Sequence, residues 1–381
     1  MTDRDTPRTK FDADAIVAEL GPILAEHAAA HDHEGTFVED NYAHLRRRGL
    51  FSAMVPTELG GGGAGHAELC DVLRRLAHHC GSTALALSMH SHLVAATVWK
   101  VRRGQPGEAL LRKVADGERV LISTGAGDWL QSTGTMQRVD GGFRVTATKA
   151  FCSGSPVGDI FITSARYDDP NTGPRVLHFP VAAKAEGVTI GRDWDTVAMR
   201  GSGSHTCRFE DVFVPQETIA LDRPREGWHP AWNVVLTVAA PIYTAPYVGI
   251  AEAACGIARA AASSRQADPS VPYLLGEMEN QLVTAQMALR EMIGVTNDFD
   301  FDPVNENANA VLIRKTIATK AAIAAVDKAM EAVGGGSLFR SRGLESRFRD
   351  VRAGTFHPLP EKPQTLFTGR MSLGLDPIAV G

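Results

Sequence analysis

The chain has 381 residues, 44% hydrophobic and 22% charged, the composition of a globular protein large enough for two or three domains. Its net charge of -5 gives no reason to expect nucleic acid or an anionic membrane as a partner. The five cysteines are scattered without a C-x-x-C pair, so we expect neither a metal site nor disulfides, and a cytoplasmic location. We also expect no leader peptide and no apolar run that spans a bilayer.

The first third of the chain has apolar residues at helical spacing. This periodicity predicts helices over residues 12–30, 37–48, 67–79, 82–100 and 110–116. Between the second and third of these, Val55 to Gly63 ends in four consecutive glycines and predicts a turn. We therefore expect an N-terminal helical domain over residues 1–118.

The pattern changes to short runs of β-branched and aromatic residues, separated by Gly, Asp and Pro. They predict strands over residues 120–123, 143–148, 160–165, 176–180 and 188–190, followed by one ending at Pro215. In the last stretch, Met199 to Pro215, a small polar half precedes an alternating half. The glycine- and serine-rich half is either a solvated hairpin turn or a turn whose donors approach a ligand. We expect a central β-sandwich or barrel over residues 119–225.

Helical periodicity returns after Trp228 and predicts three long helices, over residues 232–264, 272–299 and 305–333. The order is helices, then strands, then helices, so a doubly wound parallel sheet is excluded. We expect an α+β protein with a C-terminal helical bundle over residues 226–381.

Five motifs stand in one order along almost the whole chain. They are Val55-Pro56 with Glu58-Leu59-Gly60-Gly61, Thr124-Gly125-Ala126-Gly127-Asp128, Lys149-Ala150-Phe151-Cys152-Ser153-Gly154, the stretch Met199 to Pro215, and Gly334-Gly335 with Arg349-Asp350. Together they resemble the acyl-CoA dehydrogenase superfamily. The resemblance implies a C-terminal four-helix bundle, a homodimer or homotetramer, and FAD as cofactor, with FMN as the alternative.

The resemblance also implies which residues contact the flavin. Phe151 would cover a face of the ring, and Ser153 would donate to its N5 atom. Without the resemblance, Ser153 could equally bond its own backbone, and Gly334 could simply end a helix. Arg265 and the glycine turn would reach the cofactor of a neighbouring subunit. The implied cofactor-binding residues are Thr124, Gly125, Ala126, Gly127, Phe151, Ser153, Arg265, Gly334 and Gly335.

The sequence departs from the dehydrogenases at the catalytic base, which in the family is a glutamate. No acid follows Arg349-Asp350, and the alternative position falls at Ala239. His357 lies nearest to the expected place and can exchange protons near neutral pH, unless it is a surface histidine of a proline-flanked loop. His90 and His92 lie on a helix that should border the substrate pocket, pointing to different sides.

Three functions remain open from the sequence. One is dehydrogenation of an acyl-CoA with an unusual base, with electrons passed to an electron-transfer flavoprotein. The second is a two-component monooxygenase, resembling a branch of the superfamily in which the residues matching His357 and Ser153 flank the oxygen adduct of the flavin. Such an enzyme takes reduced flavin from a reductase and hydroxylates an aromatic or heteroatom substrate. The third is a flavin-binding protein without catalytic activity.

Overall fold

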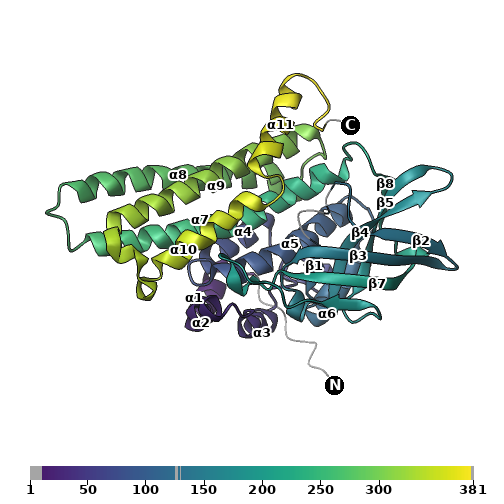
Figure 1. Cartoon of the computed structure of the whole chain (residues 1–381), viewed down its shortest axis with the longest axis horizontal. Helices are drawn as coiled ribbons and strands as arrows, with labels where there is room; N and C mark the ends of the chain where they lie inside the picture. The colour runs from purple at the N-terminus through teal and green to yellow at the C-terminus, as the bar shows by residue number, and fades with distance from the viewer. Residues whose placement is uncertain (1–10, 125–127, 129, 379–381) are drawn as a thin grey trace.

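The computed structural model describes residues 11–124, 128 and 130–378 (Figure 1). A curved sheet lies at one end of the molecule, and the long C-terminal helices extend away from it (Figure 1). The N-terminal helices pack along the near half of these long helices and beside the sheet. The expected α+β fold, with helices before and after a central β-domain, is confirmed.

From residue 11 to residue 118, all regular elements are helices. This part of the chain contains α1 (Ala13–Glu26), α2 (Ala28–Glu34), α3 (Glu39–Arg47), α4 (His66–Leu76), α5 (Gly81–Arg102) and α6 (Glu108–Gly117). The single helix expected over residues 12–30 is wrong in detail, because the chain leaves helical geometry at His27 and restarts as α2. The predicted glycine turn is tight. A Cβ at Gly61 would lie 2.1 Å from the Val55 carbonyl oxygen.

In the described residues, eight strands form one sheet in the order β6-β7-β3-β2-β4-β5-β8, with β1 paired to β4. They are β1 (Leu121–Ser123), β2 (Thr135–Val139), β3 (Gly142–Cys152), β4 (Ile160–Asp169), β5 (Gly173–Ala182), β6 (Val188–Ile190), β7 (His205–Pro215) and β8 (Leu221–Pro224). Strands β2 and β8 are not predicted from the sequence. A separate hydrophobic core, distinct from the helical one, lies within this domain.

The alternating half of the Met199–Pro215 stretch is strand β7, as predicted. Cys207, Phe209, Val212 and Val214 are all buried. The spacing lengthens from two residues to three between Phe209 and Val212, where the register with β3 shifts. Asp211 has a φ of +54° at this bulge, so the extra residue is turned out and alternation resumes after it.

The C-terminal part contains α7 (Ala231–Ala262), α8 (Ser270–Thr296), α9 (Asn305–Val333), α10 (Leu344–Asp350) and α11 (Glu361–Ser372). The long helices α7, α8 and α9 pack against one another, α10 packs on α7 and α9, and α11 packs on α9. The expectation that no apolar run is long enough to span a bilayer is corrected by α7. By length and composition this helix is apolar enough to cross a membrane, but 94% of its most apolar window is buried inside the protein. It is apolar all round because other helices surround it.

Candidate active site

Strand β3 carries a bulge where the sequence predicts the flavin-covering phenylalanine. The register against β7 shifts between Lys149 and Cys152, so two residues of β3 stand opposite one of β7. Phe151, within the bulge, has a φ of +59°, which is strained for a bulky side chain. The residue is 55% exposed, and its ring meets Trp194 edge-on, with ring centroids 6.0 Å apart. Strain and exposure of a large aromatic residue together mark a surface that a ligand ring can cover.

Ser153 lies two residues after Phe151, and its hydroxyl is one end of a row of three serine hydroxyls. Its Oγ lies 2.7 Å from Oγ of Ser204, which lies 2.8 Å from Oγ of Ser202. All three side chains are buried. The N–H of Gly154 donates to the Ser202 carbonyl at 3.0 Å, which holds the end of β3 against the turn before β7.

Thr124 is the described residue of the predicted flavin loop, since Gly125, Ala126 and Gly127 lie outside the described residues. Its hydroxyl donates to the Asp128 carboxylate at 3.2 Å. Asp128 forms a buried ion pair with Lys149, whose ammonium also donates to the Thr133 and Ser164 carbonyls at 2.8 and 2.7 Å. The two ends of this loop are therefore fastened to the sheet beside the bulge.

His357 lies between α10 and α11, with its ring against two tyrosines of α7. Tyr243 stacks on the ring at 4.8 Å with an interplanar angle of 16°, and the Tyr247 hydroxyl shares a 2.7 Å hydrogen bond with Nε2. Burial, together with the nearby Lys315 and His92, lowers the pKa of His357 to about 3. The ring is thus neutral at pH 7, and its Nδ1 has no hydrogen-bond partner in the described part of the chain.

The backbone around His357 is held as firmly as its ring. Lys315 of α9 donates to the His357 carbonyl at 2.9 Å and to the Leu359 carbonyl at 3.1 Å. The Tyr243 hydroxyl donates to the Pro358 carbonyl at 2.6 Å. Three successive carbonyls are satisfied by two side chains, so the histidine is presented in a fixed orientation.

The two histidines expected in the substrate pocket have different surroundings. Nε2–H of His90 donates to the Phe51 carbonyl at 2.7 Å, and its Nδ1 accepts from the Leu121 N–H at 2.9 Å. With the residue 1% exposed and both nitrogens used, His90 fastens α5 to β1 and has no nitrogen free for a ligand. We therefore remove it from the candidate site. His92 is close enough to His357 to influence its pKa, so it stays a candidate.

Arg265 and the glycine turn Gly334–Gly335 lie together, but far from the residues above. The Arg265 guanidinium donates to the Ala332 carbonyl at 2.9 Å, just before that turn. Both lie at the end of the helical bundle away from the sheet (Figure 1). Within one chain they cannot join Phe151 and Ser153 at one cofactor, so their predicted role requires a second subunit.

No carboxylate occupies either position expected for a dehydrogenase base. Ala239 is buried in α7, and the segment after Asp350 carries His357, which packs on Tyr243 and Tyr247 of the same helix. Burial raises the pKa of Asp350 to about 6, but Oδ1 of its carboxylate accepts from the Met199 N–H at 2.6 Å. Asp350 thereby anchors α10 to the turn before β7.

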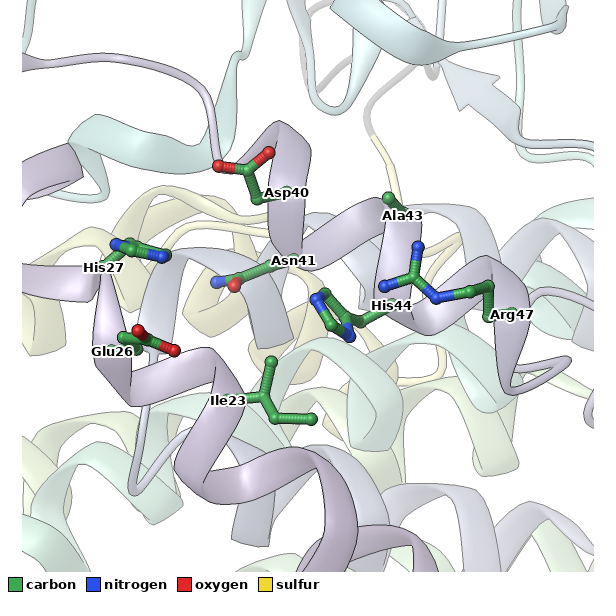
Figure 2. Close-up of a pocket in the computed structure, with 8 residues that line it drawn as sticks. All are labelled: Ile23, Glu26, His27, Asp40, Asn41, Ala43, His44 and Arg47. Atoms are coloured by element: carbon green, nitrogen blue, oxygen red, sulfur yellow. The ribbon is translucent and has the colours of Figure 1, made fainter.

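The positions of two surface hollows can be compared with the candidate site. One, of about 690 Å³, adjoins Phe151 through Trp194 and has both aromatic and basic walls, including Phe37, Arg192 and Arg200. Its size is in the range of about 300–1,000 Å³ found for ligand pockets. The other, of about 200 Å³, lies between α1 and α3 and is lined by Glu26, His27, Asp40 and other mainly exposed side chains (Figure 2). The first adjoins the candidate site and the second does not.

Three family profiles match the chain in succession. The N-terminal domain of acyl-CoA dehydrogenase matches residues 17–118, the middle domain residues 124–212, and the C-terminal domain residues 242–361. The chain belongs to the acyl-CoA dehydrogenase family. It is an acyl-CoA dehydrogenase-like flavoprotein and an oxidoreductase.

Relatives of this family member include enzymes of different activity. The L-evernosamine nitrososynthase of a Micromonospora species is 29% identical over 396 residues, covering 97% of this chain and 92% of that protein. KijD3 in complex with FMN and dTDP-3-amino-2,3,6-trideoxy-4-keto-3-methyl-D-glucose is 29% identical, with a TM-score of 0.87 over 98% of this chain and 96% of KijD3. The mitochondrial isovaleryl-CoA dehydrogenase of Oryza sativa subsp. japonica is 24% identical over 344 residues, covering 86% of this chain and 82% of that protein.

The described residues fit a flavin in two respects. Phe151, in the bulge, offers an exposed aromatic face, and Ser153, two residues later, offers a hydroxyl. Three residues that hold His357 are not predicted from the sequence: Tyr243, Tyr247 and Lys315. Ser202 and Ser204 belong to the serine-rich half of Met199 to Pro215, for which a ligand-approaching turn is one of the two predictions. The signal for the tyrosines is their four-residue spacing, which puts both on one face of α7.

Proposed function

We propose that this family member is a flavin-dependent monooxygenase that uses reduced flavin and dioxygen to oxidise a heteroatom or an aromatic carbon of a small molecule. The observation that carries the proposal is the neutral His357, held by Tyr243 and Tyr247 where a dehydrogenase needs a carboxylate. The nitrososynthases among the relatives also support the proposed oxidation of a heteroatom.

Dehydrogenation of an acyl thioester needs a strong base at the α-carbon. Ala239 supplies none, and a histidine whose pKa is about 3 is a weak base for a carbon acid. A neutral imidazole with a low pKa is better suited to accept a hydrogen bond from an amine or hydroxyl of the substrate. It can also relay a proton through its Nδ1 while Tyr247 holds Nε2.

When bound, the reduced flavin would supply two electrons, so that one atom of dioxygen enters the substrate and the other leaves as water. The chain's own residues would do the rest. Phe151 would cover the ring, Ser153 would donate a hydrogen bond at its edge, and His357 would orient the substrate. The contacts of Tyr243 and Lys315 with the backbone around His357 would keep this histidine in one orientation.

We propose FMN or FAD as the cofactor, a flavin reductase as the source of electrons, and a homo-oligomer as the working form. The FMN in the KijD3 complex supports FMN, whereas the Gly334–Gly335 turn supports the longer FAD. The bundle end that carries Arg265 would reach the site only from another subunit. The substrate class suggested by the relatives is an amino sugar nucleotide or a small aromatic such as indole.

The test supplies photoreduced FMN and oxygen-18 gas to the protein with a panel of dTDP-amino sugars and indole. Incorporation of the label into a product supports the proposal. Bleaching of oxidised flavin by an acyl-CoA, without label incorporation, would instead establish a dehydrogenase. Tight flavin binding with neither reaction would establish a non-catalytic homologue.

A variant comparison then tests the role of His357. We expect His357→Ala to lower the rate of labelled product formation by about a hundredfold, on the usual scale for an acid–base group. His27→Ala, an exposed histidine beside the smaller hollow, is the control and should be unchanged. An unaltered rate in His357→Ala would remove this residue from the mechanism.

A further inference from the structure

The hydroxyls of Ser202, Ser204 and Ser153 form a row of hydrogen bonds. Burial determines which hydroxyl donates and which accepts in each bond. We propose that Ser202 and Ser204 are positioning residues that force the hydroxyl proton of Ser153 toward the bound flavin. The inference deepens the proposed function, since it rests on the placement of a flavin at Ser153. It concerns two residues that touch no ligand themselves.

The direction begins at Ser202, which is 0% exposed. The Oγ of Ser204, 2.8 Å away, is the one hydrogen-bond partner of its hydroxyl among the described residues. A buried hydroxyl without an acceptor for its proton loses the free energy of the hydrogen bond it made with water. Ser202 therefore donates to Ser204, and the opposite direction would leave its proton without an acceptor.

The direction continues through Ser204. Its oxygen accepts from Ser202, and its own single proton has one acceptor in reach, the Oγ of Ser153 at 2.7 Å. Ser153 thus receives a hydrogen bond, and its proton is left over. Because the other two hydroxyls are already committed, this proton can only point away from them. A row of hydroxyls donating in one direction polarises each successive bond, which makes the terminal hydroxyl a better donor.

The backbone keeps the three hydroxyls in this order. Gly203, between the two positioning serines, has a φ of +55°, and a Cβ there would lie 2.5 Å from the Phe37 ring. This left-handed residue brings both serine side chains to the same side of the turn. On the other strand, the Ser153 N–H bonds the Phe151 carbonyl at 3.0 Å, so the backbone donor of Ser153 is not available to a ligand. Its hydroxyl is the donor that remains.

A fixed donor at this place favours the oxidised flavin, whose N5 atom accepts a hydrogen bond. The experiment measures the dissociation constant of oxidised FMN by quenching of its fluorescence. We expect Ser153→Ala to raise the dissociation constant about fivefold to tenfold, the value of one hydrogen bond. Ser204→Ala should raise the dissociation constant by nearly as much, and Ser202→Ala should raise it about twofold to fivefold. Ser204→Thr keeps the hydroxyl, so its dissociation constant should stay within about twofold of the wild-type value.

The decisive measurement is the coupling between the two ends of the row. In the Ser153→Ala background, Ser202→Ala should have no further effect, because its action passes through the missing hydroxyl. Ser91→Ala is the matched control, since Ser91 is a buried serine whose hydroxyl bonds the Leu87 carbonyl within α5. It should leave the FMN affinity unchanged.

The inference is overturned if Ser202→Ala lowers FMN affinity equally in both backgrounds, or if it has no effect while Ser153→Ala does. A Ser153→Ala variant with an unchanged dissociation constant for FMN also overturns the inference, because the hydroxyl then does not reach the flavin. None of these readouts uses turnover. Failure of the monooxygenase proposal would instead be seen in the oxygen-18 experiment, with these FMN affinities unaffected.

Discussion

Two buried lysines, Lys149 in the β-domain and Lys315 in the helical bundle, have opposite electrostatic surroundings. They are 1% and 2% exposed. The Lys149 ammonium forms an ion pair with Asp128 and donates to two carbonyls. The Lys315 ammonium donates to the carbonyls of His357 and Leu359 and, over the described ranges, meets no carboxylate.

Their pKa values respond accordingly. Burial lowers the pKa of both lysines, and for Lys149 the charge of Asp128 opposes this shift. Nothing opposes it for Lys315, whose pKa falls to about 8. The β-domain lysine thus has a carboxylate partner that favours its charged form, whereas the bundle lysine has none and can lose its proton close to neutral pH. The second kind of lysine is found next to the candidate catalytic histidine, where perturbed groups tend to gather.

The largest effect is expected from breaking the β-domain pair. Lys149→Met leaves Asp128 buried without its partner, and we expect a loss of about 3–5 kcal/mol in the free energy of unfolding. Urea denaturation measures it. Removing the second charge as well, in Lys149→Met with Asp128→Leu, should restore most of the loss. A single variant as stable as the wild type would show that the pair is not desolvated.

A smaller effect on stability is expected from Lys315→Met. No buried charge is left behind, only two carbonyls without donors, so we expect a loss of about 1–3 kcal/mol. Because the charge of Lys315 lowers the pKa of His357, that pKa should rise in the variant. Urea denaturation and NMR titration of the histidine test the two parts. An unchanged His357 pKa would contradict the electrostatic contact.

The difference in the free energy of unfolding between the wild type and Lys315→Met should also depend on pH. The pKa of Lys315 is lower in the folded state than in the unfolded state, so between pH 8 and about 10 the unfolded chain binds more protons there. The wild type should therefore gain stability relative to the variant as the pH rises, by about 1 kcal/mol per unit. Denaturation at pH 7, 8 and 9 tests this, and a constant difference would mean that Lys315 keeps its proton.

The smallest effect on stability is expected two residues from Lys149, at Phe151. Phe151→Gly removes an exposed ring from a left-handed position, so relief of strain offsets the extra chain entropy of glycine. We expect the free energy of unfolding to change by no more than about 0.5 kcal/mol, while the affinity for FMN falls. A loss above about 2 kcal/mol would show that the ring supports the fold.

Much of the fold could be predicted from its hydrophobic patterns. Strand β7 shows a clear alternation, and α7 is a long stretch of mainly apolar residues because other helices surround it. Strand β2 could not be found, since only Met136 of its five residues is buried. Strand β8 contains Asp222, Arg223 and Pro224, and its place at the edge of the sheet comes from pairing with β5, which no local pattern indicates.

The site was harder to predict, because its contacts join distant segments. Motif resemblance identified Ser153, Phe151 and His357 as candidates. Ser153 meets Ser204 across the β3–β7 pairing, and His357 meets Tyr247 some hundred residues earlier. His90 shows the opposite error. Its sequence position suggests a pocket, but only the structure shows that backbone groups occupy both nitrogens.

Helix α7 has a consequence for biosynthesis. Its apolar sides are covered partly by α8 and α9, which follow it in the chain. A nascent chain that has been synthesised as far as Ala262 therefore carries an apolar helix whose partners α8 and α9 are still missing. At the usual speed of translation this lasts for several seconds, until Val333 has been added. During that interval the exposed α7 would be a binding site for chaperones. We expect a chain truncated before α9 to aggregate or to bind membranes.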